Sequence, residues 1–250
     1  MRTVRATRYL TPLREGGSVP AIVEADDSGT YVVKWRGAAQ GVGALIAEVI
    51  GGELARRLAL PVPALVAIEI DALLARSEPD PEIQATLKAS TGWNVGMDYL
   101  PGALNWEPAM KAPADLAAKI VWFDALISNV DRTAKNPNML RWHKQLYLID
   151  HGAALYWHHD WANRGTKARL AFAPIRQHAL LPFASSIRDA DAELAPRVTE
   201  SLMRDVLAEV PDEYLTAEAS PAATRDAYVA YFTERMATRE FVEEAERARG

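Results

Sequence analysis

The pattern of apolar residues in this 250-residue chain changes character near Gly102. Before that point, short runs of β-branched and aromatic residues alternate with turns rich in glycine and aspartate, which is typical of antiparallel hairpins. After it, apolar residues recur at helical spacing over long stretches. The pattern predicts an α+β protein with a β-rich lobe over residues 1–101 and a helical lobe over residues 102–250.

Several elements of the N-terminal half can be placed from the sequence. The apolar spacing predicts a helix over residues 42–59, which the segment Leu60-Pro61-Val62-Pro63 ends. The polar segment 76–92 contains two prolines and is expected to be a loop with a short helical turn. The predicted strands lie at residues 4–9, 21–24, 31–35, 65–70 and 95–100.

The C-terminal half begins with a predicted helix over residues 114–128, preceded by Pro113, a residue that suits a first helical turn. A polar, loop-like stretch follows at 129–138. Two short β-prone runs, 139–142 and 145–149, flank His143-Lys144 and predict a hairpin. The remainder, from about residue 187 onwards, has helical character.

Composition excludes several classes of protein. The chain has no cysteine, so it has neither disulfides nor thiolate chemistry. The net charge of −5 and pI of about 5.6 argue against nucleic acid as a partner. The densest apolar stretch, residues 120–127, is too short to span a membrane, and residues 1–20 have no signal-peptide pattern. We therefore expect a soluble, cytoplasmic protein without a membrane partner.

The segment between residues 129 and 152 carries the clearest chemical signal. Asp131 is followed five residues later by Asn136, and Asp150 ends an apolar run two residues before Gly152. Phosphoryl transfer needs a carboxylate that orients the attacking hydroxyl and oxygen ligands that hold Mg²⁺ against the phosphates. The predicted hairpin would bring Asn136 and Asp150 back together. An isolated Asp and Asn in a loop would instead indicate turn formation.

This segment resembles the catalytic motifs of the HipA-like kinases, a bacterial group. It has N-V-D-R-T-A-K-N-P-N over residues 129–138 and I-D-H-G over 149–152. Protein-kinase-like enzymes share the order D-x-x-x-x-N, hairpin, D-x-G. The N-terminal half agrees, with G-G-S-V-P, Y-V-V-K and G-M-D-Y-L-P-G. The resemblance covers roughly residues 10–160. It implies a two-lobed protein-kinase-like fold and transfer of the γ-phosphoryl group of Mg-ATP to a hydroxyl acceptor, such as a protein serine or threonine.

The resemblance assigns a role to each motif residue. Asp131 would orient or deprotonate the acceptor hydroxyl, and Asn136 and Asp150 would bind magnesium. Lys34 would contact the α- and β-phosphates, and Glu48 on the following helix would pair with it. The expected nucleotide contacts are Gly16, Gly17 and Ser18 in a loop over the phosphates, and Met97, Asp98, Tyr99 and Leu100 at the adenine.

Some alternatives stay open at this level. Glu53 lies on the same predicted helix and competes with Glu48 for Lys34. His151 stands where D-F-G has phenylalanine, and Thr133 where several relatives have histidine. Ser18 is a candidate autophosphorylation site by the same resemblance. A nucleotide-binding regulatory module, or a toxin–antitoxin component with an antitoxin or other regulatory partner, is the alternative to an active kinase.

Overall fold

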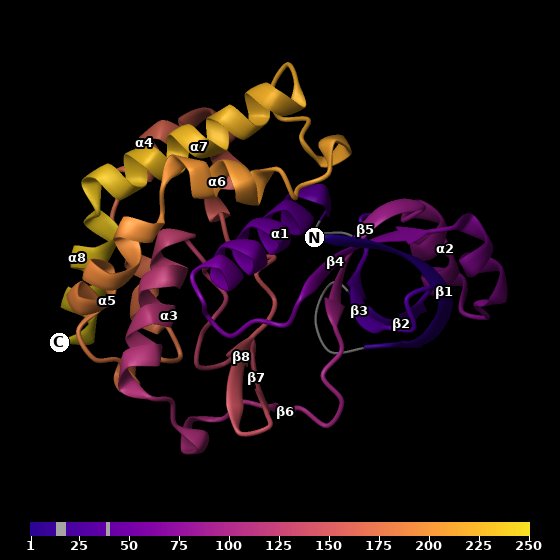
Figure 1. Ribbon diagram of the computed structural model, residues 1–250, viewed down its shortest axis with the longest axis horizontal. Coiled ribbons are helices and arrows are strands. Elements are labelled where there is room, and N and C mark those ends of the chain that lie inside the picture. Colours follow the sequence, from indigo (N-terminus) through magenta and orange to yellow (C-terminus); the bar gives the residue numbers. More distant parts are fainter. Residues whose placement is uncertain (14–18, 39–40) are drawn as a thin grey trace.

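The computed structural model describes residues 1–13, 19–38 and 41–250. The expected phosphate-loop residues Gly16, Gly17 and Ser18 lie outside these ranges. A β-barrel forms one side of the molecule and a group of helices the other (Figure 1). The expected α+β class, with a β-rich N-terminal region and a helical C-terminal region, is confirmed.

Five strands close into a barrel in the order β1-β2-β3-β5-β4. Alternate residues of each strand point inward, as in β2, where Ala21, Val23 and Ala25 are buried and their neighbours are not. The barrel closes through a parallel β1–β4 pair in which Arg2 lies opposite Val66. The strands are β1 (Arg2–Pro12), β2 (Ala21–Ala25), β3 (Thr30–Lys34), β4 (Leu65–Ile70) and β5 (Gly92–Asp98).

Helix α1 (Gly41–Arg57) lies between the barrel and the C-terminal helices (Figure 1). It contacts β4 and β5 on one side and α6 on the other. Its apolar side chains are therefore buried around most of the helix, which is the pattern of a core helix rather than a surface one. Leu45, Val49, Ile50 and Leu54 belong to the larger hydrophobic cluster, which is shared with the C-terminal helices.

The C-terminal region is built around α3 (Ala114–Leu126), whose residues from Ala117 onward are almost all buried. Beside it lies a small sheet in the order β6-β7-β8. Its β7–β8 hairpin turns at His143 and Lys144, both in the left-handed conformation that a tight two-residue hairpin requires. The strands are β6 (Leu104–Asn105), β7 (Met139–Trp142) and β8 (Gln145–Leu148). The later helices are α4 (Arg164–Ala168), α5 (Ile187–Leu194), α6 (Glu200–Leu207), α7 (Pro221–Thr238) and α8 (Glu240–Arg249).

Seven short 3-10 helices connect the described elements. They are η1 (Ala72–Ser77), η2 (Pro108–Met110), η3 (Tyr156–Asn163), η4 (Ala173–Gln177), η5 (Leu181–Phe183), η6 (Ala195–Arg197) and η7 (Asp212–Tyr214). In the described residues, no helix combines the length and apolar character needed to cross a membrane.

The prediction of a loop with only a short helical turn over residues 76–92 is wrong about the helix, which is longer. That stretch contains helix α2 (Pro81–Ala89), with the Asp80 side chain accepting hydrogen bonds from the backbone N–H groups of Glu82 and Ile83. An aspartate N-cap followed by proline at the first helical position is a strong start signal. Proline suggests a loop in this polar segment, but Pro81 begins the helix.

Candidate active site

Lys34 contacts carboxylates from two other segments, the following helix α1 and the distant segment after β8. It ends β3, where alternation places its side chain on the outer face of the barrel, toward α1. Its Nζ lies 2.6 Å from Glu48 Oε2 on α1 and 2.5 Å from Asp150 Oδ1, just after β8. Only 14% of the lysine side chain and 2% of the glutamate side chain are exposed, against 42% for Asp150. Of the three side chains, Asp150 is therefore the one most accessible to a ligand from solvent.

Burial and charge act in opposite directions on these groups. Burial disfavours the ammonium form of Lys34, but the Glu48 and Asp150 carboxylates outweigh it and raise the pKa of Lys34. Burial likewise tends to raise the pKa of Asp150, and the Lys34 ammonium reverses this and lowers it. Asp150 is thus ionised at neutral pH, as a cation ligand must be.

The segment after β8 packs closely against α1. The His151 backbone favours the ionised form of the Glu48 carboxylate, against the larger effect of burial, which raises the pKa of Glu48. Gly51, one turn along α1, faces the His151 ring so closely that a Cβ there would lie 2.6 Å from His151 Cβ. Glu53, the sequence-level competitor, bonds Arg56 instead, with 2.6 Å between Oε2 and Nη2. The geometry therefore pairs Lys34 with Glu48.

Asp131 lies in the loop between α3 and β7, held by two asparagines. Its Oδ2 accepts from Asn136 Nδ2 at 2.8 Å and from Asn138 Nδ2 at 3.1 Å. Its backbone N–H donates to Asn129 Oδ1 at 3.1 Å. A turn between Thr133 and Asn136, with backbone hydrogen bonds of 3.0 and 3.2 Å, returns the chain toward the aspartate. The spacing of five residues thus serves to bring the Asn136 amide onto the Asp131 carboxylate.

A buried polar group beneath this loop was missed by sequence reasoning. Asp124, near the end of α3, has Oδ2 2.5 Å from Arg132 Nε and 2.9 Å from His178 Nε2. Its Oδ1 accepts from Asn129 Nδ2 at 2.9 Å. The neighbouring cation lowers the pKa of Asp124 despite complete burial. The one sequence signal was Asp124 itself, an acid inside an otherwise apolar helical run.

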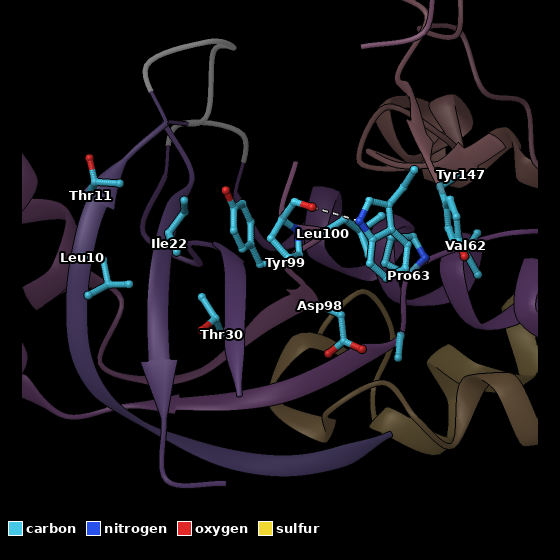
Figure 2. A pocket seen from close by; sticks show the side chains of 13 residues that line it. Leu10, Thr11, Ile22, Thr30, Val62, Pro63, Asp98, Tyr99, Leu100 and Tyr147 are labelled. Atoms are coloured by element: carbon cyan, nitrogen blue, oxygen red, sulfur yellow. Dashed lines mark hydrogen bonds between the residues drawn. The ribbon is translucent and has the colours of Figure 1, made fainter. Parts of the chain in front are cut away.

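A groove of about 840 Å³ runs from the barrel to the β7–β8 hairpin (Figure 2). Asp98, Tyr99 and Leu100, which follow β5, line it, whereas Met97 does not and packs against the larger hydrophobic cluster. The hairpin is fastened to the end of this segment, because Trp142 Nε1 donates to Pro101 O at 3.0 Å. The remaining lining is mostly apolar: Leu10, Thr11, Ile22, Thr30, Val62, Pro63, Ala64, Pro101, Trp142 and Tyr147.

The oxygen atoms of Asp150 and Asn136 suit a hard divalent cation. Asp150 Oδ2 and Asn136 Oδ1 accept no hydrogen bond from the described residues, while Asn136 Nδ2 is engaged by Asp131. Within the same residues, no group of three or more His, Cys, Asp or Glu side chains could form an all-protein metal site. Two protein ligands with water and phosphate oxygens are the usual arrangement for Mg²⁺, so the donor set fits that ion.

Comparison with known proteins establishes the family. The family model of HipA-like kinases matches residues 7–245, nearly the whole chain. The chain belongs to this family. No curated protein sequence matches it. The HipA-like kinase fold found here is similar to the crystal structure of the Helicobacter pylori proinflammatory kinase CtkA, with a TM-score of 0.55 and 12% identity over 98% of this chain and 97% of that one. At that identity the likeness concerns the fold alone.

Membership of the HipA-like kinase family implies phosphotransferase activity with ATP as the donor. The matched range includes both the Lys34–Glu48–Asp150 group and the Asp131 loop.

The adjacent His158 and His159 do not form a metal site with any described neighbour. His158 instead bonds Tyr228, 2.7 Å from Nε2 to the phenolic oxygen, and Trp157 and Trp161 stack beside it as packing residues.

Proposed function

We propose that this HipA-like kinase transfers the γ-phosphoryl group of Mg-ATP to a hydroxyl group, with a protein serine or threonine as the acceptor. The observation that carries the proposal is the meeting of Lys34, Glu48 and Asp150 from three separate segments. A cation contributed by a strand and fixed by a helix-borne carboxylate suits phosphate binding, because catalysis of phosphoryl transfer is mainly positioning and charge neutralisation.

In this proposal, residues 1–101 form the nucleotide-binding lobe and residues 102–250 the catalytic lobe. The adenine lies in the groove beside Leu100 and Ile22, and the phosphates extend toward Lys34. Asp150 and Asn136 would hold magnesium, which neutralises phosphate charge when bound. Lys34 keeps its own charge at neutral pH because its pKa is raised.

Asp131 orients the acceptor. Its carboxylate is fixed by the amides of Asn136 and Asn138, so its position is set before a substrate arrives. A hydroxyl group placed beside this carboxylate donates its proton to it as the oxygen attacks the γ-phosphorus, and the bond from that phosphorus to the bridging oxygen breaks, so that ADP leaves. The contacts from the two amides limit the rotation of the carboxylate and so favour one approach direction.

The test is ADP release from ATP by the purified chain, with and without magnesium, for the wild type and Asp150→Asn. We expect release that needs magnesium and falls at least about 10²-fold in the variant, since the variant loses a charged metal ligand. Binding of ATP without any release by the wild type would favour the regulatory-module alternative. Failure to bind Mg-ATP would contradict the proposal.

A further inference from the structure

Arg132 connects the two segments that carry the proposed catalytic groups. Its Nη1 donates to the carbonyl oxygen of Asn138, at the end of the Asp131 loop, and to that of Ile149 at 3.2 Å. The Ile149 carbonyl belongs to the peptide bond that leads into Asp150. The same guanidinium therefore contacts both segments, which lie side by side at the open end of the β7–β8 hairpin.

The contacted backbone is in a conformation that needs support. Asn138 and Asp150 have φ values of 47° and 55°, in the left-handed region that L-residues rarely adopt. Two donors converge on the Asn138 carbonyl, namely Arg132 and the N–H of Ile149 at 3.0 Å. Fixing the peptide planes at these positions fixes the direction in which the Asp150 and Asn138 side chains leave the backbone, and the Asn138 amide in turn holds the Asp131 carboxylate.

Arg132 is itself held rigidly. Its side chain has no exposed surface, and neither does that of its ion-pair partner Asp124. His178 reaches the same carboxylate from a distant segment; its Nδ1 accepts from the N–H of Leu180 at 3.0 Å, so its Nε2 is the protonated nitrogen that donates to Asp124. The backbone of this segment is also attached to the loop, because Ala179 N donates to Arg132 O at 3.0 Å.

We propose that Arg132 is a positioning residue, which aligns the Asp131 loop with Asp150 through the Asn138 and Ile149 carbonyls while Asp124 and His178 hold its guanidinium. The inference rests on the proposed function for its effect on turnover. The alignment itself is a property of the fold and can be measured without ATP. Arg132 does not touch the reacting groups, so its loss should lower the rate far more than nucleotide affinity.

The experiment compares Arg132→Lys with Arg235→Lys. Lysine at 132 keeps a positive charge, but its single nitrogen cannot bond the Asp124 carboxylate and both carbonyls at once, as Arg132 does with Nε and Nη1. Arg235 is the matched control, since it is also buried and donates to backbone carbonyls, including those of Ala125 and Leu126, but to none in residues 129–152. ADP release, Mg-ATP affinity and amide hydrogen exchange are measured for each variant.

We expect Arg132→Lys to lower turnover about 10²-fold, because a displacement of about 1 Å in reacting groups costs this much. Its Mg-ATP affinity should stay within about threefold of the wild type by the same reasoning. Amide exchange should become faster at residues 131–138 and 149–152 in this variant and not in Arg235→Lys. Turnover and exchange equal to those of the control would overturn the proposal.

Two further arms keep the test decisive. If Arg132→Lys does not fold, the pair Asp124→Asn with Arg132→Gln removes both buried charges together, so that neither remains unpaired. The same loss of turnover and faster exchange are expected of it. If the wild type releases no ADP at all, the proposed function fails, and the exchange comparison alone decides whether Arg132 aligns the two segments.

Discussion

Gly51 on α1 and His151 after β8 are in such close contact that a Cβ at position 51 would lie 2.6 Å from His151 Cβ and 2.8 Å from its Cγ. His151 is 2% exposed and packs edge-on against Phe123, with ring centroids 6.0 Å apart. The imidazole therefore cannot move away from an added methyl group without disturbing the core. The position of α1 relative to Asp150 depends on the absence of a side chain at residue 51.

Gly51→Ala should therefore displace α1 from Asp150 and lower turnover. A shift of about 1 Å in a catalytic group can cost about 10²-fold in rate. ADP release is the measurement, with Gly165→Ala as the control, because a Cβ at Gly165 would meet nothing within 4 Å. Equal activity in the two variants would show that α1 tolerates the methyl group and that the contact does not set the geometry.

Lys34→Met should weaken ATP binding and also destabilise the protein. The variant leaves Glu48, which is 2% exposed, without its cation. A buried group that loses its partner costs about 1–3 kcal/mol. Adding Glu48→Gln removes the unpaired carboxylate, so the double variant should regain part of the free energy of unfolding but none of the affinity for ATP. Urea unfolding at pH 7 and ATP titration separate the two effects.

If Lys34→Met unfolds at the same urea concentration as the wild type, the ion pair between Lys34 and Glu48 does not contribute to the stability of the fold. If the double variant recovers ATP affinity, the lysine does not contact phosphate. Either result would remove the corresponding role of Lys34.

His158 predicts how stability depends on pH. Burial, with a smaller contribution from His159, lowers the pKa of His158 from 6.5 to about 4, so the folded protein holds the ring neutral. The unfolded chain takes up a proton as pH falls below about 6.5, and the folded state does so only near 4. This residue alone should therefore lower the free energy of unfolding by about 2 kcal/mol between pH 7 and pH 5.

His158→Gln should reduce that loss, as measured by urea unfolding at both pH values. Tyr228→Phe is the matched control. It removes the hydroxyl that bonds His158 but leaves the imidazole in place, so the pH dependence should persist while stability at pH 7 falls by about 1 kcal/mol. An unchanged difference between pH 7 and pH 5 in His158→Gln would contradict the assignment.

The parts of the site that depend on local spacing could be predicted from the sequence. The order Asp131, Asn136, hairpin and Asp150 predicts one group. The structure shows a tight turn that brings Asn136 onto Asp131 and a backbone hydrogen bond from Ile149, the residue before Asp150, to Asn138. The shared magnesium site of Asn136 and Asp150 stays a prediction. The resemblance to a kinase family supplied the pairing of Lys34 with Glu48, which spacing alone left open against Glu53. The overall α+β division followed from the change in apolar periodicity.

The remaining features depend on contacts between distant segments. His178 lies 54 residues after Asp124, and no local pattern connects them. The parallel β1–β4 pair closes the barrel by joining two strands separated by more than half of the N-terminal region. Such a pair is not connected by a tight turn, so no turn motif in the sequence predicts it. Residues 156–186 contain three short 3-10 helices and the five-residue helix α4, without a clear apolar period. Helix α2 differs, because its Asp80-Pro81 start signal was present in the sequence.

The most direct test of the central claim compares Asp131→Asn with the wild type in Mg-ATP binding and in phosphoryl transfer. Transfer is measured by the release of ADP and by the intact mass of the protein. Asp205→Asn, an exposed aspartate on α6, is the control. We predict that Asp131→Asn binds Mg-ATP with wild-type affinity and loses at least about 10²-fold in turnover, since it loses the carboxylate that orients the acceptor. Wild-type turnover in Asp131→Asn would contradict the account.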